Sequence, residues 1–341
     1  MKKNILFLVL CFCIFMNAYG LNRTVINVPQ DYDTIQEAID FSVDGDEVIV
    51  SPGTYYETIN FMGKAITVGS LFYTTQDTSY ISQTIIDAEQ SGSCVKFENL
   101  EENDSVLTGF TITNGYSEGS GGGIYASDEC SPTLTHLRII ANQAESFGGG
   151  FYFGESCSPI MENIISEGNT ASHGAGGAYN FYCDLIMEDS VIKDNISEID
   201  GGGLFVAEAC IDLENVLIEN NSAYNGGGLS LHGWELWDDY VSLKNVYIHQ
   251  NQATNYGGIC TSIPLFLENV VIAENSAEEL CGGLYSEHVL ITYAEEISLR
   301  SSIYLNEAGE YRGKDIHAYS SDQEVYLAAF SVLQPYSHFA Y

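Results

Sequence analysis

The sequence predicts an all-β fold, a parallel β-helix of about ten coils with an N-terminal capping helix. Three observations carry this prediction. The composition, with 33 glycines and 23 tyrosines against 6 prolines, favours strands and turns. A Gly-Gly-apolar motif recurs at a nearly constant spacing, and an asparagine that closes an apolar strand recurs in phase with it. No segment of helical period lies between the repeats, which excludes leucine-rich and helical repeat proteins.

The first residues are typical of a signal for export. Lys2 and Lys3 precede an apolar run over residues 5–16, and Ala18-Tyr19-Gly20 supplies small residues for cleavage. No later apolar run reaches the length of a membrane-spanning helix, so the chain is not expected to span a membrane after cleavage. We expect a signal peptide over 1–20 and a single domain over 21–341, with the cap and first coils at 25–110 and the Gly-Gly/Asn repeats at 110–320.

Charge and hydrophobicity limit the classes of function that the protein can have. The chain has 11 Lys and Arg against 47 Asp and Glu, a formal net charge of −36. Binding to nucleic acid is excluded, because phosphate contacts need clustered basic side chains. Apolar residues make up 45% of the chain and charged residues 17%, so it can bury a large core and is not a disordered acidic tail.

An amphipathic helix is predicted near the N-terminal end of the domain. It covers residues 33–43, with Asp33 as its N-cap and Gly45 after its end. Such a helix can cover the first apolar layer of a solenoid. Its apolar face is formed by Ile35, Ala38, Ile39 and Val43.

The repeats follow this cap. The glycine motif advances in steps of 27, 27, 26, 25, 30 and 25 residues, which leaves room for three short strands in each coil. Coils of a parallel β-helix lie about 4.8 Å apart, so residues in one sequence column become neighbours. The motif occurs at Gly122-Gly123-Ile124, Gly149-Gly150-Phe151, Gly176-Gly177-Ala178, Gly202-Gly203-Leu204, Gly227-Gly228-Leu229, Gly257-Gly258-Ile259 and Gly282-Gly283-Leu284. The closing asparagines are Asn114, Asn142, Asn169, Asn195, Asn221, Asn251, Asn275 and Asn306.

Two further columns are expected to stack. The position six before the closing asparagine suits a left-handed turn, where stacked amides can hydrogen-bond along the axis. It holds His136, Asn163, Asp189, Asn215, Asn245 and Asn269. The second column is Cys130, Cys157, Cys183 and Cys210. Cα atoms on adjacent coils are within disulfide range, and buried apolar thiols are the alternative.

The opening segments resemble those of bacterial right-handed parallel β-helix proteins of the pectin-lyase-like superfamily. The strings that carry the resemblance are Ile26-Asn27-Val28-Pro29, Tyr32-Asp33-Thr34-Ile35-Gln36-Glu37-Ala38-Ile39, Gly45-Asp46, Pro52-Gly53-Thr54-Tyr55 and Gly63-Lys64-Ala65-Ile66. The later repeats are similar to those of polymorphic outer-membrane proteins. The resemblance implies a right-handed coil and an extracellular, bacterial cell-surface or outer-membrane-associated location.

This superfamily contains lyases, hydrolases, esterases and adhesins, so the resemblance alone does not choose among them. The Asn-Thr-Asp, Gly-His-Gly and Arg-Ile-Lys strings of polygalacturonase-like enzymes are absent. The string Gly53-Thr54-Tyr55-Tyr56-Glu57 is similar to one that is structural in pectin-esterase-like proteins, whose catalytic Asp-Phe-Ile-Phe-Gly is missing here. No catalytic residue is assigned.

Two surface columns are candidate binding features. The outward residues after the glycine motif include Tyr125, Tyr152, Tyr179 and Phe205, whose rings could stack on sugars or on one another. The second column contains Glu162, Glu188 and Glu214, whose mutual repulsion calcium would relieve if the side chains do not simply splay apart.

The 30-residue coil holds the third candidate, a loop that contains Trp234, Trp237, Asp238 and Asp239. The expected function is an exported or cell-surface, adhesin-like binding module that contacts carbohydrate or another cell surface. The alternative is a carbohydrate-active enzyme, a polysaccharide lyase or glycoside hydrolase. End-to-end contact at the C-terminal coil is also open. Calcium is the one cofactor that the sequence suggests.

Overall fold

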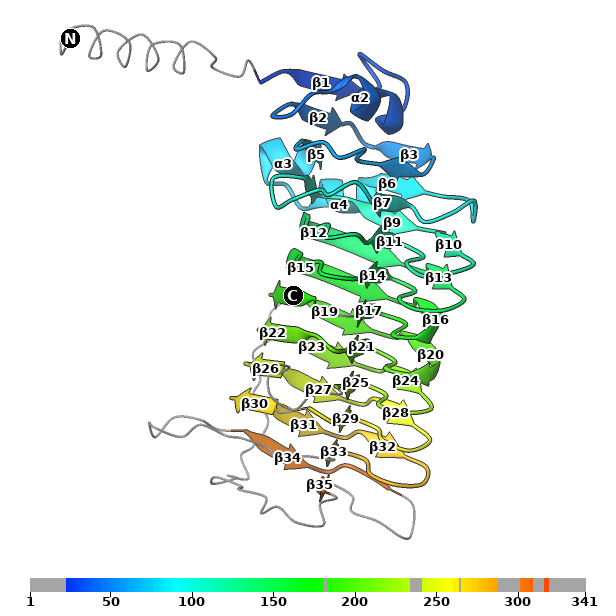
Figure 1. Ribbon diagram of the computed structural model, residues 1–341, viewed down its shortest axis with the longest axis vertical. Helices are drawn as coiled ribbons and strands as arrows, with labels where there is room; N and C mark the ends of the chain where they lie inside the picture. Colours follow the sequence, from blue (N-terminus) through cyan, green and yellow to red (C-terminus); the bar gives the residue numbers. More distant parts are fainter. Residues whose placement is uncertain are drawn as a thin grey trace, which may run out of the picture.

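The protein is a parallel β-helix, as the repeats predict (Figure 1). The structure is a computed structural model that describes residues 23–180, 183–233, 241–263, 265–286, 301–308 and 316–318. Throughout these residues the paired strands run parallel, and each pairs with a strand roughly one repeat away. The expected signal peptide at 1–20 lies outside the described residues.

Three sheets run along the long axis (Figure 1). The ten-stranded sheet takes one strand from each successive coil: β4 (Ile59–Asn60), β7 (Val95–Phe97), β11 (Ile124–Ala126), β14 (Phe151–Phe153), β17 (Gly177–Asn180), β21 (Leu204–Ala207), β25 (Leu229–His232), β29 (Ile259–Thr261), β33 (Leu284–Ser286) and β35 (Ile316–Ala318). The seven-stranded sheet contains β10 (Tyr116–Ser117), β13 (Gln143–Ala144), β16 (Thr170–His173), β20 (Ile196–Asp200), β24 (Ser222–Ala223), β28 (Gln252–Ala253) and β32 (Ser276–Ala277).

The eighteen-stranded sheet consists of two ladders that two long strands join, β12 (Thr133–Ile140) and β15 (Ile160–Glu167). One ladder adds β1 (Val25–Val28), β2 (Glu47–Val50), β5 (Thr67–Ser70), β8 (Val106–Thr108), β18 (Asp184–Glu188), β22 (Cys210–Glu214), β26 (Val241–Lys244) and β30 (Leu265–Glu268). The other adds β3 (Gly53–Tyr56), β6 (Thr84–Asp87), β9 (Thr111–Thr113), β19 (Val191–Lys193), β23 (Leu217–Glu219), β27 (Tyr247–His249), β31 (Val271–Ala273) and β34 (Ser302–Tyr304).

The predicted capping helix is present as α2 (Ile35–Phe41), at the N-terminal end of the solenoid (Figure 1). It buries Ile35, Ala38 and Ile39 against the first coil, whereas Val43, predicted for the same face, lies beyond the end of the helix and is exposed. The expectation that Asp33 is the N-cap is wrong. Thr34 takes this place, because its backbone is extended and its side chain accepts from the backbone N–H of Glu37 at 3.1 Å.

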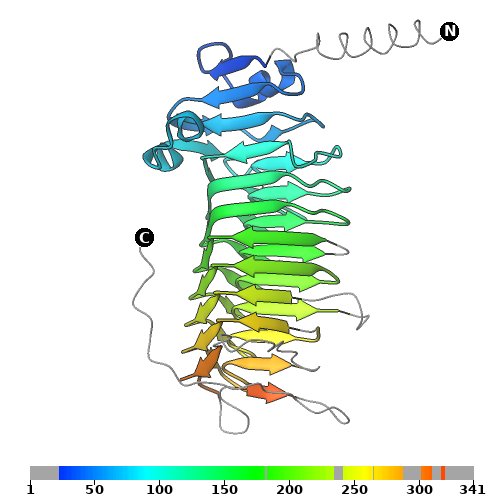
Figure 2. The same ribbon diagram turned by 90° about the vertical axis from the view of Figure 1, so that its left-hand side faces the viewer.

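Glu57 completes this cap from the next coil. Its two carboxylate oxygens accept from the backbone N–H groups of Ile35 and Gln36, both at 2.9 Å. These N–H groups have no partner inside the helix, so the carboxylate satisfies them and faces the positive end of the helix dipole. The glutamate of the Gly-x-Tyr-x-Glu string is therefore structural. Two further short helices, α3 (Leu71–Thr75) and α4 (Ser79–Gln83), project from the side of the early coils (Figure 2).

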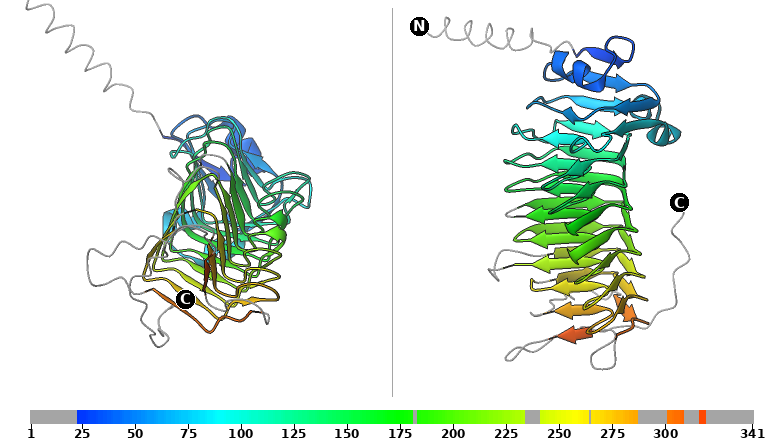
Figure 3. Two further views of the ribbon diagram at one scale, coloured as in Figure 1. Left: turned by 60° about the horizontal axis from the view of Figure 1, so that its bottom comes forward. Right: turned by 90° about the vertical axis from the view of Figure 1, so that its right-hand side faces the viewer.

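The left-handed column is confirmed. Its six predicted members have φ between 49° and 57°. Four of the side chains also stack as expected: the amide of Asn215 donates to Asp189, that of Asn245 to Asn215 and that of Asn269 to Asn245, each at 2.9 Å. The amide of Asn163 instead donates to Glu162. Residues about 26 positions apart are therefore neighbours along the axis, and the coils follow one another as a regular stack (Figure 3, right).

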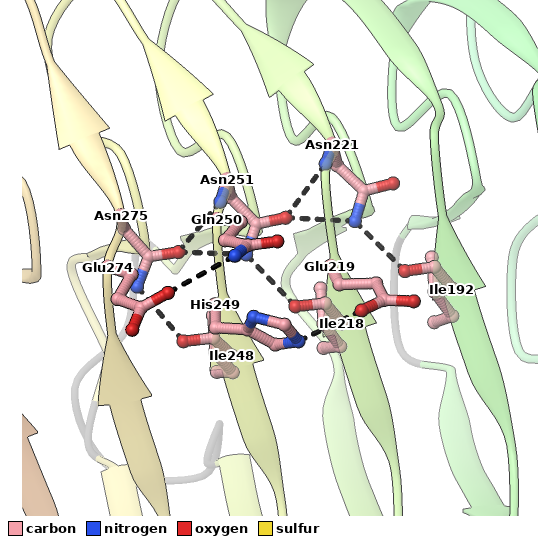
Figure 4. Close-up of polar contacts among 10 residues, drawn as sticks. All are labelled: Ile192, Ile218, Glu219, Asn221, Ile248, His249, Gln250, Asn251, Glu274 and Asn275. Atoms are coloured by element: carbon pink, nitrogen blue, oxygen red, sulfur yellow. Dashed lines mark hydrogen bonds and ion pairs between the residues drawn. The ribbon is translucent and has the colours of Figure 1, made fainter.

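The closing asparagines form a second, buried ladder (Figure 4). Asn251 is representative: its side-chain oxygen accepts from the backbone N–H and the side-chain amide of Asn221, at 2.9 and 3.0 Å. Its own amide donates to Asn275 at 2.9 Å and to the carbonyl of Ile218 at 3.0 Å. The ladder therefore satisfies side-chain and backbone polar groups in the buried interior. It contains Asn142, Asn169, Asn195, Asn221, Asn251, Asn275 and Asn306.

The assignment of Asn114 to this ladder is wrong. Gly115 occupies the ladder position, because its backbone N–H donates to the side-chain oxygen of Asn142 at 2.8 Å. Asn114 lies one residue earlier, with φ of 56°, and its amide donates to Asp87. In register, Asn114 aligns with Ala141 and Gly115 with Asn142. The spacing of the asparagines alone does not detect this difference of one residue.

Candidate functional site

The glutamate column has the predicted register on the eighteen-stranded sheet. Glu162 pairs with Glu188, and Glu188 with Glu214. Lys244 follows on the next coil and binds Glu214 at 2.7 Å, a contact that raises the pKa of this lysine. Within the described ranges, no three His, Cys, Asp or Glu side chains gather closely enough to hold a metal ion. Calcium at Glu162, Glu188 and Glu214 stays a prediction.

The aromatic column on the ten-stranded sheet is only partly continuous. Tyr125 and Tyr152 are register partners, and their rings stack with centroids 5.7 Å apart and an interplanar angle of 18°. Both are half-buried. Phe205 is 8% exposed and lies under neighbouring rings. The column therefore offers two partly accessible tyrosine rings followed by a packed phenylalanine.

Tyr179 does not belong to this column. The register pairs Tyr152 with Ala178 and Ala178 with Phe205, so Tyr179 is one position out of phase. The cause is the preceding coil, which is one residue shorter than the glycine spacing suggests. Ala175 takes the place that the first glycine of the motif has in the other coils, because the backbone N–H of Gly150 donates to the carbonyl of Ala175 at 2.9 Å, as that of Gly123 does to the carbonyl of Gly149.

A second row of side chains lies beside the aromatic column, at the turn between the seven- and ten-stranded sheets. Each member directly precedes the glycine turn of its coil. The ring of Phe147 lies 4.8 Å from that of His173, 5.7 Å from that of Phe205 and 6.3 Å from that of Tyr152, measured between centroids. We call the two rows together with His232, whose ring contacts Phe205, the corner strip. It is formed by Tyr125, Phe147, Tyr152, His173, Asp200, Phe205, Asn225 and His232.

Polar groups continue the strip along the axis. Nε2 of His173 lies 3.7 Å from the carboxylate of Asp200. The amide of Asn225 donates to the same carboxylate at 2.9 Å, and the amide of Asn255 donates to Asn225 at 2.7 Å. Burial lowers the pKa of His173 and outweighs the opposing effect of Asp200. Its Nδ1 is buried without a hydrogen-bond partner.

The strip reaches the 30-residue coil at His232. The ring of His232 lies 5.5 Å from that of Phe205, and its Nε2 is 2.9 Å from Oγ of Ser230. The backbone N–H of Gly233 donates to Oγ of Ser262 at 3.1 Å, which anchors the end of β25 to the next coil. The predicted binding residues that follow, Trp234, Trp237, Asp238 and Asp239, lie outside the described residues.

Two surface clefts lie on the seven-stranded sheet, with small buried side chains along their floors. The first, of about 500 Å³, borders the strip, since Glu145 and Ser172 line it just before Phe147 and His173 in sequence. Its other lining residues are Gln143, Ala144, Thr170, Ala171, Ile196 and Glu198. The second, of about 420 Å³, is lined by Ser222, Ala223, Gln252, Ala253, Thr254, Ser276, Ala277, Glu278, Glu307 and Ala308.

The first cleft and the strip together present ring faces next to hydroxyl, amide and carboxylate groups. Such a combination can hold a sugar, because a ring covers the apolar face of the pyranose while polar groups take its hydroxyls. The ring and polar contacts of the strip follow one another from coil to coil along the solenoid axis. The combination therefore suits an extended chain of sugars better than a compact ligand.

The sequence prediction found Tyr125, Tyr152 and Phe205 but not Phe147, His173, Asp200 or Asn225. A signal for the second row does exist: each of these residues precedes the glycine that has a positive φ in its coil, at Gly148, Gly174, Gly201 and Gly226. The residue types differ from coil to coil, so a search for columns of similar chemistry does not find them.

Among the described helices, none is both long and apolar enough to cross a membrane. No protein-family model and no curated protein matches the chain. Two solved structures are similar to it. Pectate lyase Pel9A aligns with a TM-score of 0.48 and 12% identity, over 89% of this chain and 80% of that one. The pectin methylesterase from Aspergillus niger aligns with a TM-score of 0.38 and 10% identity, over 92% and 91%. The assignment of the fold rests on the strand register described above.

Proposed function

We propose that the protein is an exported carbohydrate-binding module, adhesin-like in its use of a long surface, and that the corner strip with its bordering cleft contacts the ligand. One observation carries the proposal. Rings follow one another over several coils, from Tyr125 through Tyr152, Phe147 and Phe205 to His232, with successive centroids 5.5 to 6.3 Å apart. A row of this kind presents repeated contacts to a repeating polymer.

The negative charge of the protein limits which polysaccharides it can bind. The chain has a net charge of −36, and Glu145 and Glu198 line the cleft beside the strip. An acidic polysaccharide would be repelled by this surface. The proposal therefore names a neutral or amino-group-bearing polysaccharide, on a cell surface or in an extracellular matrix. Trp234 and Trp237 follow Gly233 in sequence and lie outside the described residues, and we propose that they also contact the ligand.

The test is binding to a panel of neutral, cationic and anionic polysaccharides, with affinity measured by calorimetry or by retardation in polymer-containing gels. Tyr152→Ala removes one of the two accessible stacked rings, and we expect affinity to fall about tenfold. Tyr247→Ala is the matched control, because this tyrosine also stacks on a neighbour, His249 at 4.3 Å, but lies on the eighteen-stranded sheet.

The proposal fails if the Tyr152→Ala protein binds as tightly as the parent, or if Tyr247→Ala is the variant that loses affinity. The same incubations distinguish the enzymatic alternative. A lyase would release new unsaturated ends and a hydrolase new reducing ends, with or without added calcium. A binding module leaves the polymer intact.

A further inference from the structure

The cysteine column places thiols on successive coils. Cys157 precedes β15 and Cys183 precedes β18, which are register partners. The backbone N–H of Asp184 donates to the carbonyl of Cys157 at 3.1 Å, and that of Cys210 donates to the carbonyl of Cys183 at 3.0 Å. The coils are therefore hydrogen-bonded to each other at the cysteines themselves.

Cys157 and Cys183, both thiols in the structure, share one hydrogen-bond acceptor. The Sγ of Cys183 donates to the carbonyl oxygen of Gly154 at 2.7 Å, and the backbone N–H of Cys157 donates to the same oxygen at 3.2 Å. The two thiols also contact each other, and this contact together with burial raises the pKa of Cys157. Adjacent parallel strands are about 4.8 Å apart, within the Cα separation that a disulfide spans.

The other neighbours in the column are placed differently. The Sγ of Cys130 contacts the buried carboxylate of Glu101 at 3.1 Å, and that carboxylate also accepts from the backbone N–H groups of Gly63 and Asn99. Cys130 is thus held toward a loop of the preceding coils. The prediction that Cys210 belongs to this column is wrong, because the register pairs Cys210 with Asp184, the residue after Cys183. Cys210 is also partly exposed.

We propose that Cys157 and Cys183 form a disulfide that links adjacent coils, made while the chain folds in the presence of a small-molecule disulfide. One cysteine thiolate attacks the small disulfide and releases one small thiol. The second cysteine thiolate then attacks the mixed disulfide and releases the other. The two cysteines lose two protons and two electrons, and the small disulfide is reduced to two thiols. In the folded coil these cysteines are 0% and 1% exposed, so the exchange precedes burial and the finished bond is shielded from reductants.

The test is refolding of the reduced, denatured chain in a buffer of reduced and oxidised glutathione, followed by alkylation of remaining thiols and peptide mass spectrometry. We expect a linked peptide pair that contains Cys157 and Cys183, lighter by two hydrogens than the two thiol peptides together. A parallel sample refolded with reductant alone gives both cysteines alkylated. Recovery of both as alkylated thiols from the oxidising buffer, or a dominant link from either one to Cys130 or Cys210, overturns the proposal.

A second measurement uses stability. The oxidised protein should unfold at a higher denaturant concentration than the reduced protein, because the link restricts the unfolded chain. This difference should disappear in Cys157→Ala and Cys183→Ala but persist in Cys94→Ala, which removes a buried thiol of another column. A difference that survives in Cys157→Ala contradicts the proposal. Where a variant does not fold, the mass measurement on the parent chain decides alone.

Discussion

At the scale of single residues, the buried asparagine ladder is the feature most sensitive to substitution. Each ladder amide satisfies groups on both neighbouring coils, so removing one side chain leaves several buried donors and acceptors without partners. We expect Asn251→Ala to lower the free energy of unfolding by about 3 kcal/mol. Urea denaturation followed by circular dichroism measures this change.

Asn245→Gly is the control on the same coil. Asn245 also donates to and accepts from stacked amides, but at the surface, where water replaces the lost partners. Glycine keeps the left-handed backbone, φ 54°, without strain. The free energy of unfolding should change by less than about 1 kcal/mol. Equal losses in the two variants would contradict the buried, shared character of the ladder.

His173 makes stability depend on pH. Its pKa in the folded protein is lowered from 6.5, chiefly because Phe147, Phe205 and the surrounding turn bury it, with Asp200 opposing and His232 adding to the shift. The fold therefore favours the neutral ring. As pH falls through 6.5 the unfolded chain takes up a proton that the folded chain does not, and the free energy of unfolding decreases.

The measurement is the urea midpoint between about pH 7.5 and pH 5.5. The parent protein should lose more stability over this interval than His173→Gln, in which the titrating ring is absent. Identical pH dependence in both proteins would show that burial of His173 does not contribute.

The left-handed column could be predicted at this scale because its cause is local: Asn, Asp and Gly tolerate positive φ, and their recurrence at one position is visible in the chain. The corner strip could not, since Phe147, His173 and Asp200 differ in type. They share only their position directly before a glycine with positive φ. Their side chains become neighbours, and form one surface, only when adjacent coils pack together.

At the scale of elements, close contact between coils depends on the second glycine of each motif. A Cβ at Gly150 would lie 2.2 Å from the carbonyl oxygen of Gly176 on the next coil and 2.8 Å from Oγ of Ser166. Backbone cannot move there without breaking the register of the ten-stranded sheet. We expect Gly150→Ala to lower the free energy of unfolding by about 3 kcal/mol, measured by urea denaturation.

Gly92→Ala is the matched substitution. The new Cβ would meet only the methyl of Thr58, at an ordinary 3.7 Å. Its effect should stay within about 0.5 kcal/mol. If Gly150→Ala is equally silent, the coils approach less closely than described.

The motif spacing predicted the order of elements but not every register. In one coil Ala175 occupies the position of the first glycine and Gly176 that of the second, so the Gly-Gly pair is shifted by one residue there. The spacing of Gly176-Gly177 therefore predicts a register that is one residue out of phase with the observed one, and it assigns Tyr179 to the wrong column. The helix N-cap was missed by one residue for a similar reason: Asp33 and Thr34 are both good caps, and the contact with Glu37 selects Thr34.

At the scale of the whole molecule, the large negative net charge is expected to lower the stability of the folded protein. With 47 acidic residues against 11 basic ones, surface carboxylates repel one another along the solenoid, as in the pairs of Glu162 with Glu188 and Glu188 with Glu214. Screening should relieve this repulsion. We expect the urea midpoint to rise steadily between about 0.02 and about 0.5 M sodium chloride, with the same rise for potassium chloride. A midpoint that falls with salt would mean that ion pairs such as Lys244 with Glu214 outweigh the repulsion.

The arrangement on which everything else depends is the stacking of residues one repeat apart. It is tested most directly by nuclear Overhauser measurements on protein with labelled isoleucine methyl groups. Ile192, Ile218, Ile248 and Ile272 are successive register partners and fully buried. We predict cross-peaks between each consecutive pair along this column. Their absence, with cross-peaks instead between residues three or four apart in sequence, would contradict the parallel β-helix and the binding surface built on it.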